Sequence, residues 1–597
     1  MNTKLTLFFF GVLILSSCAQ VQSKQYRSTS NYPPYQEVVT HVLETYHFDY
    51  NPEFRKTEAG YEVSILDANT RQFGAPLLVW SAKTQAYLSL DLEPVGADKG
   101  SGALASMLRA DLGYYDLHPY YGYPQWATDA IAYWEANPPI TADAWYSKGE
   151  AYRHRATNRV HLHFSHVDST LWYPAEPGEQ NPWSSRQIQS YEADCAAAAA
   201  AFQEALAIDS SYSERPLADR LGFFGAEMYH EMRPLVGESK ARAYIKPYPL
   251  TAFQRRMAYE QLSACEPQAL LFVWSDADYF PLLYLQAQEG FRTDVTVVTA
   301  QYLGFDLYLA DLLTQPRFGK APLSVSLSAE VLGAQPKFIL NRPYSSYGTA
   351  ITIAELVSAI NDPAKRAEEA WEGLPHYLKL PKGPLMLQWP EGATSTLNVL
   401  KYTLDKGDYV LLDLLQQYVG KRPIHITGGI VYELGISNNM VSRGPLSSLV
   451  AQSYPAFEEE LNWQYIDSLP PHTLPKWSVE ARRYQLYRLH VPFQELLNHY
   501  FETDQIDKMG EVLDRYLEVF PVDRVPLTLF GVAFLNYAYM VNEAQGDQWL
   551  QLLVKDLQTA QREGTMSPDE LEYQVDMVKV VLERFRPEKL SVLKVFR

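Results

Sequence analysis

Three aspartates follow two short apolar runs in the middle of the chain, in a pattern that suits a ligand site. Asp276 and Asp278 come directly after the apolar run 269–275, and Asp306 comes shortly after the β-branched run 294–299. If the two runs form adjacent parallel strands, the three carboxylates lie at one edge of the sheet, where open α/β sheets bind ligands. Carboxylates in that position can hold a cation or sugar hydroxyls. In the alternative interpretation, Asp278 caps the following helix and the other two are solvated.

A histidine-rich stretch offers a second set of possible ligands: His161, His163, His166 and Asp168. On a strand, His161 and His163 would point to the same face, and imidazoles with a carboxylate can hold zinc. The hydrolase pattern His-x-His-x-Asp-His is not met, however. The alternative is a polar hairpin with solvated histidines, so we predict no metal and keep this stretch as the candidate if a metal is bound.

Nucleophilic catalysis has no sequence pattern to support it. The chain contains no Gly-x-Ser-x-Gly elbow and no Gly-rich phosphate loop. Cys195 and Cys265 have no histidine or basic residue as an immediate neighbour, so neither looks activated. We expect both to be free buried thiols, and we predict no cofactor.

The amino terminus has the features of an exported lipoprotein. Lys4 precedes the apolar run 5–15, which is too short to span a membrane and is typical of a secretory signal peptide. The following Leu15-Ser16-Ser17-Cys18 resembles the processing site of bacterial lipoproteins, which implies lipidation at Cys18. The residues after Cys18 are Ala and Gln, without Asp, which favours the outer membrane, facing the periplasm. The alternative is an ordinary signal peptide with a chance cysteine.

Alternating strand and helix patterns in the middle of the chain predict a βαβ unit that would position the aspartates. Residues 281–290 read as a helix between the runs 269–275 and 294–299, which makes a right-handed βαβ unit. Further strands are expected at these positions: 323–327, 338–340, 385–388 and 423–427. We therefore predict one α/β domain with a mostly parallel sheet over 256–450. A helix and strand-like runs at 61–66, 76–80 and 86–92 predict a small α+β region over 36–112.

Segments with helical sequence patterns lie on both sides of this domain and resemble tetratricopeptide repeats. Trp145-x2-Lys148-Gly149-x2-Tyr152 has the spacing of a first repeat helix, with Lys in place of Leu. Ala198, Phe202 and Ala205 have the spacing of the second helix, so residues 158–189 would be an insertion between partners. A second candidate repeat has its packing positions at Phe493, Leu497, Tyr500, Met509, Leu513, Tyr516 and Pro521. Such repeats expose a surface that binds peptides or protein segments.

Three strings in the middle third resemble a known family. They are Ser275-Asp276-Ala277-Asp278-Tyr279-Phe280-Pro281, Glu289-Gly290-Phe291-Arg292-Thr293-Asp294 and Leu303-Gly304-Phe305-Asp306. Together with Lys421-Arg422-Pro423-Ile424-His425, they resemble the soluble region of the glycosyltransferase family 117, the bacterial protein O-mannosyltransferase-like membrane proteins, over about 265–449. The resemblance implies a ligand-binding role for Arg422 beside the aspartates. The family is expected to keep its transferase chemistry in a membrane-embedded half, which this chain lacks.

Composition restricts the partners. The 597-residue chain has a formal net charge of −19, with 47% hydrophobic and 20% charged residues. It can therefore build large cores, and its charge argues against nucleic acid or an anionic membrane surface as partner. We divide it as follows: signal peptide 1–18, tether 19–35, small α+β region 36–112, helical region 113–255, α/β domain 256–450 and C-terminal helical repeats 451–597.

These features predict an α/β plus all-α protein, in which a mostly parallel-sheet α/β domain is flanked by tetratricopeptide-like repeats. The predicted function is a lipid-anchored envelope binding or assembly protein without catalytic activity of its own. Its partner would be a protein or peptide on the helical repeats, and it would meet the membrane only through its anchor. The alternative is an accessory factor or enzyme in protein glycosylation or glycan handling, which would act on a glycan through the α/β domain.

Overall fold

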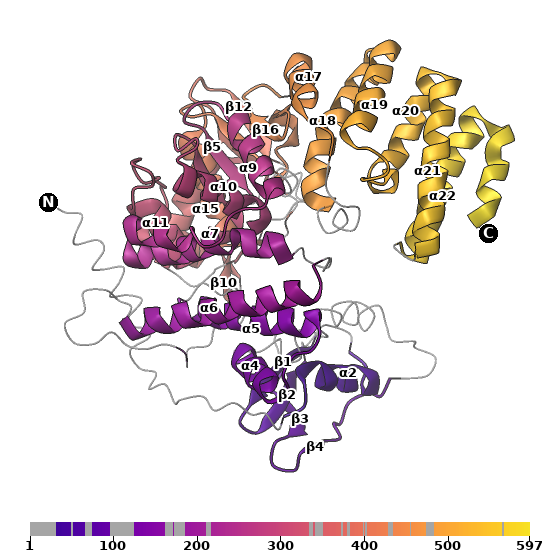
Figure 1. Cartoon of the computed structure of the whole chain (residues 1–597). Helices are drawn as coiled ribbons and strands as arrows, with labels where there is room; N and C mark the ends of the chain where they lie inside the picture. Colours follow the sequence, from indigo (N-terminus) through magenta and orange to yellow (C-terminus); the bar gives the residue numbers. More distant parts are fainter. Residues whose placement is uncertain are drawn as a thin grey trace. The chain divides into compact units, whose positions relative to one another are not determined.

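The structure is a computed structural model, shown in Figure 1, in which the chain forms two compact units. The residues it describes are 32–48, 52–65, 74–95, 125–160, 171, 185–210, 217–333, 338–340, 350–371, 374–378, 383–397, 399, 401, 403–427, 434–453, 455–472, 483–563 and 566–596. The first unit comprises Met1–Tyr212 and Glu231–Gly237, and the second comprises Ser213–His230 and Glu238–Arg597. Helix α7 (Leu217–Val236) therefore contributes residues to both units.

The first unit contains a four-stranded antiparallel sheet and helix α2 (Tyr35–Thr45). Its strands, in spatial order, are β1 (Glu53–Thr57), β2 (Gly60–Ser64), β3 (Leu77–Ser81) and β4 (Ala86–Tyr87). Val38 and Val42 share one face of α2, and they are buried in the same core as Tyr61 and Trp80 of the sheet. Strand β1 was not predicted, because its sequence Glu-Phe-Arg-Lys-Thr has no apolar run.

Three longer helices complete the first unit: α4 (Trp126–Ala136), α5 (Ala142–Arg159) and α6 (Ser185–Ile208). The predicted pairing of α5 with α6 across the insertion is confirmed, since a Cβ atom on Gly149 would lie 2.5 Å from the ring of Phe202. The ring of Tyr146 also lies 5.8 Å from that of Phe202, centroid to centroid. Tyr146 is buried at this contact whereas Trp145 is half-buried. The glycine of the repeat spacing is thus needed for close helix packing.

Buried ion pairs hold the end of α7 to these helices within the first unit. Glu231 accepts two hydrogen bonds from Arg153, at 2.7 and 2.9 Å, and one from the hydroxyl of Tyr191, at 2.6 Å. Arg155 and Arg159 both donate to Asp194 of α6. Because all of these carboxylates are buried and satisfied, we interpret them as structural.

The largest sheet of the second unit is mixed, so the prediction of a mostly parallel sheet is wrong. Its strand order is β15-β16-β14-β5-β6. Only β14 (Ile424–Ile426), β5 (Leu270–Val273) and β6 (Thr296–Thr299) run parallel. Strands β15 (Met440–Arg443) and β16 (Leu446–Leu449) form an antiparallel hairpin on one edge. The turn signal was present in Gly444-Pro445, where Gly444 has φ +62°.

The other strands of the predicted domain form two separate small sheets. One has the order β13-β7-β10-β9, with β7 (Phe338–Leu340), β9 (Ala370–Trp371), β10 (Leu374–Leu378) and β13 (Thr403–Leu404). The other has the order β12-β11-β8, with β8 (Ile351–Thr352), β11 (Leu385–Gln388) and β12 (Thr394–Leu397). Residues 323–327 form no strand. Strands of two to five residues offer few ladder hydrogen bonds, so local hairpins compete well with a long parallel sheet.

Helices make up most of the rest of the second unit. Around the sheets they are α8 (Glu238–Ala241), η2 (Arg242–Tyr244), α9 (Ala252–Ala264), α10 (Asp276–Glu289), η3 (Ala300–Tyr302), α11 (Asp306–Thr314), α12 (Ala329–Gly333), α13 (Ile353–Asn361), α14 (Pro363–Glu369), α15 (Lys406–Tyr418) and η4 (Ser437–Asn439). Within the described ranges, no helix combines the length and the apolar character needed to cross a bilayer.

The C-terminal part of the second unit is a run of packed helices, coloured orange to yellow in Figure 1. They are α17 (Glu459–Ser468), α18 (Arg483–Glu502), α19 (Ile506–Val519), η7 (Leu527–Leu529), η8 (Gly531–Ala533), α20 (Phe534–Val541), α21 (Glu543–Glu563), α22 (Pro568–Phe585) and η9 (Pro587–Phe596). Phe493 and Tyr500 of α18 share one core with Met509 and Tyr516 of α19. The predicted helix pair is therefore confirmed, while its membership of the tetratricopeptide family stays a prediction.

Candidate functional site

The predicted βαβ unit is present and brings the loops after β5 and β6 to one edge of the sheet. Strands β5 and β6 are parallel neighbours, with Leu270 opposite Thr296 and Val273 opposite Thr299. Helix α10 begins directly after Ser275 and ends at Gly290, which takes a left-handed conformation with φ +68°. The edge that was predicted to carry a ligand site is therefore built as expected.

Each of the three aspartates at this edge has a different partner. The hydroxyl of Tyr302 donates to Asp276 at 2.5 Å. Asp278 is buried, accepts a hydrogen bond from Ser275 at 2.6 Å and forms an ion pair with Arg488. Asp306 is paired with the ammonium of Lys406. The carboxylates are thus engaged by different side chains, and Asp276 and Asp306 are not merely solvated as the alternative interpretation expected.

Aromatic rings and a histidine surround the first of these contacts. The ring of His230 stacks on Tyr302 with 5.1 Å between centroids, and its Nδ1 lies 3.2 Å from the hydroxyl of Tyr279. Arg317 in turn lies 3.4 Å from the same hydroxyl and pairs with Asp311 at 2.7 Å. Sequence inspection missed this buried polar chain, because its members are scattered between positions 230 and 317 in no recognisable motif.

Arg422 lies at the opposite end of the strands. It precedes β14 and donates to the carbonyl oxygens of Gln268 and Ala269, at 2.7 and 3.1 Å, and to the hydroxyl of Thr296 at 2.9 Å. These residues are at the amino ends of β5 and β6. The structure therefore does not bring Arg422 together with the aspartates as the resemblance implied.

The string Glu289 to Asp294 has a structural role that explains its composition. Gly290 ends α10, and Arg292 donates to the carbonyl oxygens of Leu262 and Cys265 at the end of α9, at 2.7 and 2.9 Å. Asp294 binds the Arg292 guanidinium and accepts the backbone N–H of Gln268 at 2.9 Å. The Arg292 hydrogen bond holds the pKa of the Asp294 carboxyl well below its usual range. The string thus fastens two helix ends to the sheet.

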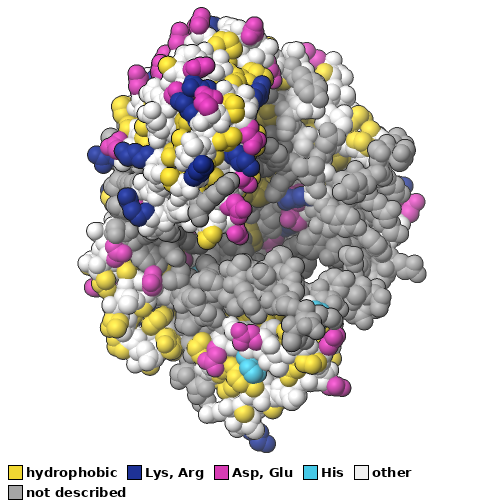
Figure 2. Space-filling model, turned by 90° about the vertical axis from the view of Figure 1, so that its right-hand side faces the viewer, with side chains coloured by type: hydrophobic (Ala, Val, Ile, Leu, Met, Phe, Trp, Pro, Cys, Tyr) yellow, Lys and Arg dark blue, Asp and Glu magenta, His cyan; other side chains and the backbone are white. Residues whose placement is uncertain are grey.

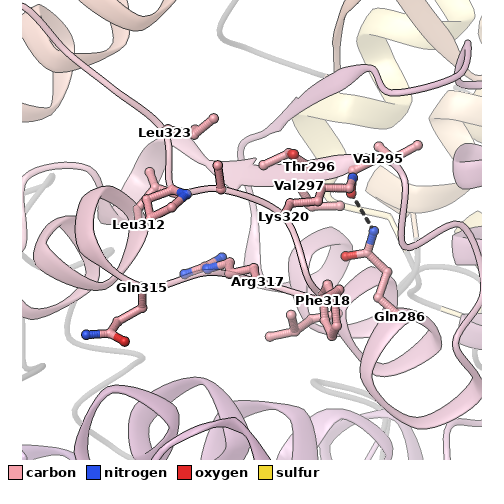
Figure 3. Close-up of a pocket in the computed structure, with 13 residues that line it drawn as sticks. Gln286, Val295, Thr296, Val297, Leu312, Gln315, Arg317, Phe318, Lys320 and Leu323 are labelled. Carbon is pink, nitrogen blue, oxygen red and sulfur yellow. Dashed lines mark hydrogen bonds between the residues drawn. The ribbon is translucent and has the colours of Figure 1, made fainter.

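A small cavity lies beside the edge strand β6, on the side of α10 and α11. Figure 3 shows it between Thr296 and Val297 of β6, Gln286 of α10 and the turn that carries Arg317 and Lys320. Its volume is about 20 Å³, enough for about one water molecule. The cavity contains no carboxylate in its lining, which makes it a basic site in an acidic protein.

The remaining candidates fall into two groups. Cys18 and the stretch His161, His163, His166 and Asp168 lie outside the described residues. In the part of the chain that the structure describes, no group of three or more His, Cys, Asp or Glu side chains is placed to hold a metal ion.

The two remaining cysteines are confirmed as free buried thiols. Burial raises the pKa of both Cys195 and Cys265 to about 12. Neither is therefore a nucleophile at neutral pH.

Comparison with known proteins corrects the family assignment. Residues 254–370, about a fifth of the chain, match the family described as TMEM260-associated domain 2. No curated protein and no solved structure matches the chain. The predicted relation to glycosyltransferase family 117 is therefore wrong, since the family match is to a different description. The matched stretch runs from α9 to the end of α14 and includes the three aspartates and the cavity, but not Arg422.

Proposed function

We propose that this chain is a non-catalytic envelope protein that binds a protein or peptide partner on its C-terminal helices. The observation that carries the proposal is a surface on α18 and α20, here called the acidic–aromatic face. Its members are Tyr487, Glu495, Asn498, Phe501, Glu502 and Tyr537.

Helical spacing places the α18 members of this face together. Tyr487, Asn498 and Phe501 are separated by 11 and then three residues, which returns them to one side of the helix. Tyr487 is 46% exposed and Phe501 is 50% exposed. The hydroxyl of Tyr537 from α20 donates to the side-chain oxygen of Asn498 at 2.6 Å, and its ring lies 6.2 Å from that of Phe501. Exposed aromatic rings held in place in this way suit a protein contact.

Two carboxylates on the same face lack a counter-charge. Among the described residues, neither Glu495 nor Glu502 forms an ion pair with a Lys, Arg or His side chain. Burial, with a smaller effect from Glu502, raises the pKa of the Glu495 carboxyl. A cationic group of a partner would relieve this unfavourable environment. The partner that fits best is therefore a segment with basic and apolar residues.

Further apolar side chains lie on the last helices. Figure 2 looks onto the C-terminal end of the chain, where hydrophobic side chains lie on the surface between acidic and basic ones. Tyr573, Met577 and Val580 follow one face of α22 and are 66%, 37% and 62% exposed. The C-terminal helices thus offer more than one apolar surface, and the rings of the acidic–aromatic face are held together by contacts between two helices.

A displayed library of random dodecapeptides tests the proposal. We expect peptides that contain Lys or Arg beside an apolar residue to be enriched on the wild-type chain, and Phe501→Ala with Glu502→Gln to remove the enrichment. Glu563→Gln is the matched control, because Glu563 is an exposed carboxylate at the end of α21, outside the face. An equal enrichment on both variants, or none on the wild type, would overturn the proposal.

The proposal includes export and anchoring through lipid on Cys18, with the chain on the periplasmic side of the outer membrane. It rests on the sequence 15–18 behind a short apolar run. The alternative role in glycan transfer rested on the family assignment that the comparison corrects, and no contact in the described part of the chain favours it.

A further inference from the structure

Helix α22 carries an apolar stripe on the side that faces away from the core. Its members, Tyr573, Met577 and Val580, are four and then three residues apart, so they lie on one side of the helix. All three side chains are exposed, whereas Val578 and Leu582 on the opposite side are buried in the core of the C-terminal helices. A helix at the end of a stack usually presents polar residues outward. An apolar stripe in this position therefore points to a contact with another molecule.

The stripe ends in opposite charges. Asp569 lies in the first turn of α22, four residues before Tyr573, and Arg584 lies in the last turn, four residues after Val580. This spacing keeps both charged side chains on the side of the stripe. Both are exposed, and neither forms an ion pair with another described residue. The face therefore has a carboxylate at one end, a guanidinium at the other and apolar side chains between them.

The order of these residues fits a second copy of the same helix that runs in the opposite direction. With a two-fold axis beside Met577, Tyr573 of one copy faces Val580 of the other. The same register places Asp569 of one copy opposite Arg584 of the other, and symmetry forms each of these contacts twice. A parallel pair of helices would instead place each charge opposite its own kind, which is unfavourable. The antiparallel register thus covers the stripe and pairs its charges at once.

We propose that the outward side of α22 is a self-association surface, on which α22 of a second copy of this chain docks antiparallel. The contact is independent of the acidic–aromatic face, which lies on α18 and α20 and would take a basic segment. One helix from each copy covers less than the roughly 800 Å² per partner of a standard interface. The expected dimer is therefore weak, with a Kd in the micromolar range.

An acidic flank beside the stripe limits the affinity of this dimer. Glu572, Asp576 and Glu583 are exposed there, and Lys579, 4.0 Å from Glu583, offsets part of their charge. A two-fold axis beside Met577 brings Asp576 of both copies near each other at the rim, where salt screens their repulsion. Asp576→Asn should therefore strengthen self-association. The same change would weaken the binding of a basic partner segment, so it distinguishes the two kinds of occupant.

Sedimentation equilibrium of the full chain at pH 7, over about 1–200 μM, measures the self-association. We expect a monomer–dimer equilibrium for the wild type, and Tyr573→Ser with Val580→Ser should raise its Kd about tenfold or more. Leu461→Ser is the matched control, since Leu461 is an exposed apolar residue on α17, outside the stripe. Phe501→Ala with Glu502→Gln should also leave the dimer unchanged. Loss of the dimer in that variant would place the contact on the acidic–aromatic face and overturn the proposal.

Charge reversal tests the antiparallel register. Asp569→Lys places two cations opposite each other and Arg584→Glu places two anions opposite each other, so each variant alone should self-associate about tenfold more weakly. Mixed in equal amounts, the two variants should form a heterodimer. In that pair the introduced lysine faces the introduced glutamate, and the native Arg584 faces the native Asp569. Thermal unfolding of each variant checks that the chain stays folded.

A cysteine pair decides the question if a charge reversal unfolds the chain. In a Cys18→Ser background, oxidised Met577→Cys should give a disulfide-linked dimer, because position 577 lies beside the axis. Tyr573→Cys should not, because its two copies would lie about seven residues apart along the helices, beyond the reach of a disulfide. A chain that is monomeric at every concentration, variants that form no heterodimer on mixing, or equal cross-linking at both positions would overturn the proposal.

Discussion

Asp278 at the start of α10 is ion-paired with Arg488 of α18, 210 residues further along the chain. Both side chains are buried, at 4% and 6% exposure of the residue. Asp278 also accepts the hydroxyl of Ser275. This contact couples the sheet edge that carries the predicted ligand site to the C-terminal helices, within the second unit.

Asp278→Asn should therefore cost much more stability than a helix-start carboxylate usually does. An exposed aspartate at a helix start contributes up to about 1 kcal/mol, which is the cost that the capping interpretation of Asp278 would give. Removing one partner of a buried ion pair costs about 3–5 kcal/mol. Chemical denaturation of Asp278→Asn, Arg488→Met and the double variant measures the coupling. Additive losses in the double variant would show that the two side chains act independently.

The cost expected for a helix-start aspartate is smaller than the cost expected for a buried ion pair, and this difference shows what the sequence could predict. The β5-α10-β6 unit and the α18-α19 pair were recognised, because each depends on a local pattern of apolar residues. The partner of Asp278 could not be recognised, because no local pattern connects it with Arg488. The mixed sheet was missed for a similar reason: β14 pairs with β5 on one side and with the hairpin strand β16 on the other, and short strands carry little register information.

The basic cavity had no sequence signal. Lys320 and Arg317 look like an ordinary surface turn, and their environment arises only when α10, α11 and β6 pack around that turn. Arg422 was selected for a resemblance that proved wrong, although it does lie near Lys320. Its proximity to the cavity follows from its position before β14, which no single residue pattern indicates.

Gly149→Ala should destabilise the first unit. A Cβ atom at this position would lie 2.5 Å from the Phe202 ring, and such overpacking costs about 1–3 kcal/mol. Calorimetry should show a lower Tm, and Phe202→Leu in the same chain should recover part of the loss. Gly333→Ala is the control, because a Cβ atom there meets no atom within 4 Å. Equal effects at the two glycines would mean that the α5-α6 packing is looser than the structure shows.

His490 should make the second unit sensitive to acid. Its ring stacks between Phe530 and Phe534, its Nδ1 has no partner among the described residues, and burial lowers its pKa to about 3. Near pH 6.5 the unfolded chain therefore binds a proton at His490, whereas the folded chain does not. The contribution of neutral His490 to the free energy of unfolding is therefore fully present above pH 6.5 and decreases as the pH falls below it. Between pH 7 and pH 5, protonation of this residue in the unfolded chain should lower the free energy of unfolding by about 2 kcal/mol.

His490→Phe should flatten that dependence between pH 7 and pH 5. His425 acts in the same direction, since burial lowers its pKa to about 4, so the wild type minus the variant isolates the contribution of His490. Urea denaturation at pH 7 and pH 5 gives the change in the free energy of unfolding with pH for the wild type and for His490→Phe. A variant that loses as much stability as the wild type would show that His490 is protonated in the folded chain.

Cys18 should carry lipid when the full-length chain is made in a bacterium that processes lipoproteins. Metabolic labelling with radioactive palmitate should mark the wild type, and Cys18→Ser should remove the label because no thiol remains at the processing site. Equal label on both proteins would remove the anchor from the proposed function. Cys195→Ser is the control, since that thiol is buried.

Asp306→Asn separates a structural carboxylate from a ligand-binding one. Lys406 is buried at 1% exposure, and its ammonium is paired with Asp306, whose side chain is about half exposed. Removing the charge of Asp306 leaves a buried cation poorly compensated, which should cost about 1–3 kcal/mol, near the lower end because solvent screens the pair. Adding Lys406→Met should restore stability, since the unpaired cation is then gone. A ligand-binding Asp306 would behave differently: Asp306→Asn would leave urea denaturation unchanged, and Lys406→Met would not compensate for it.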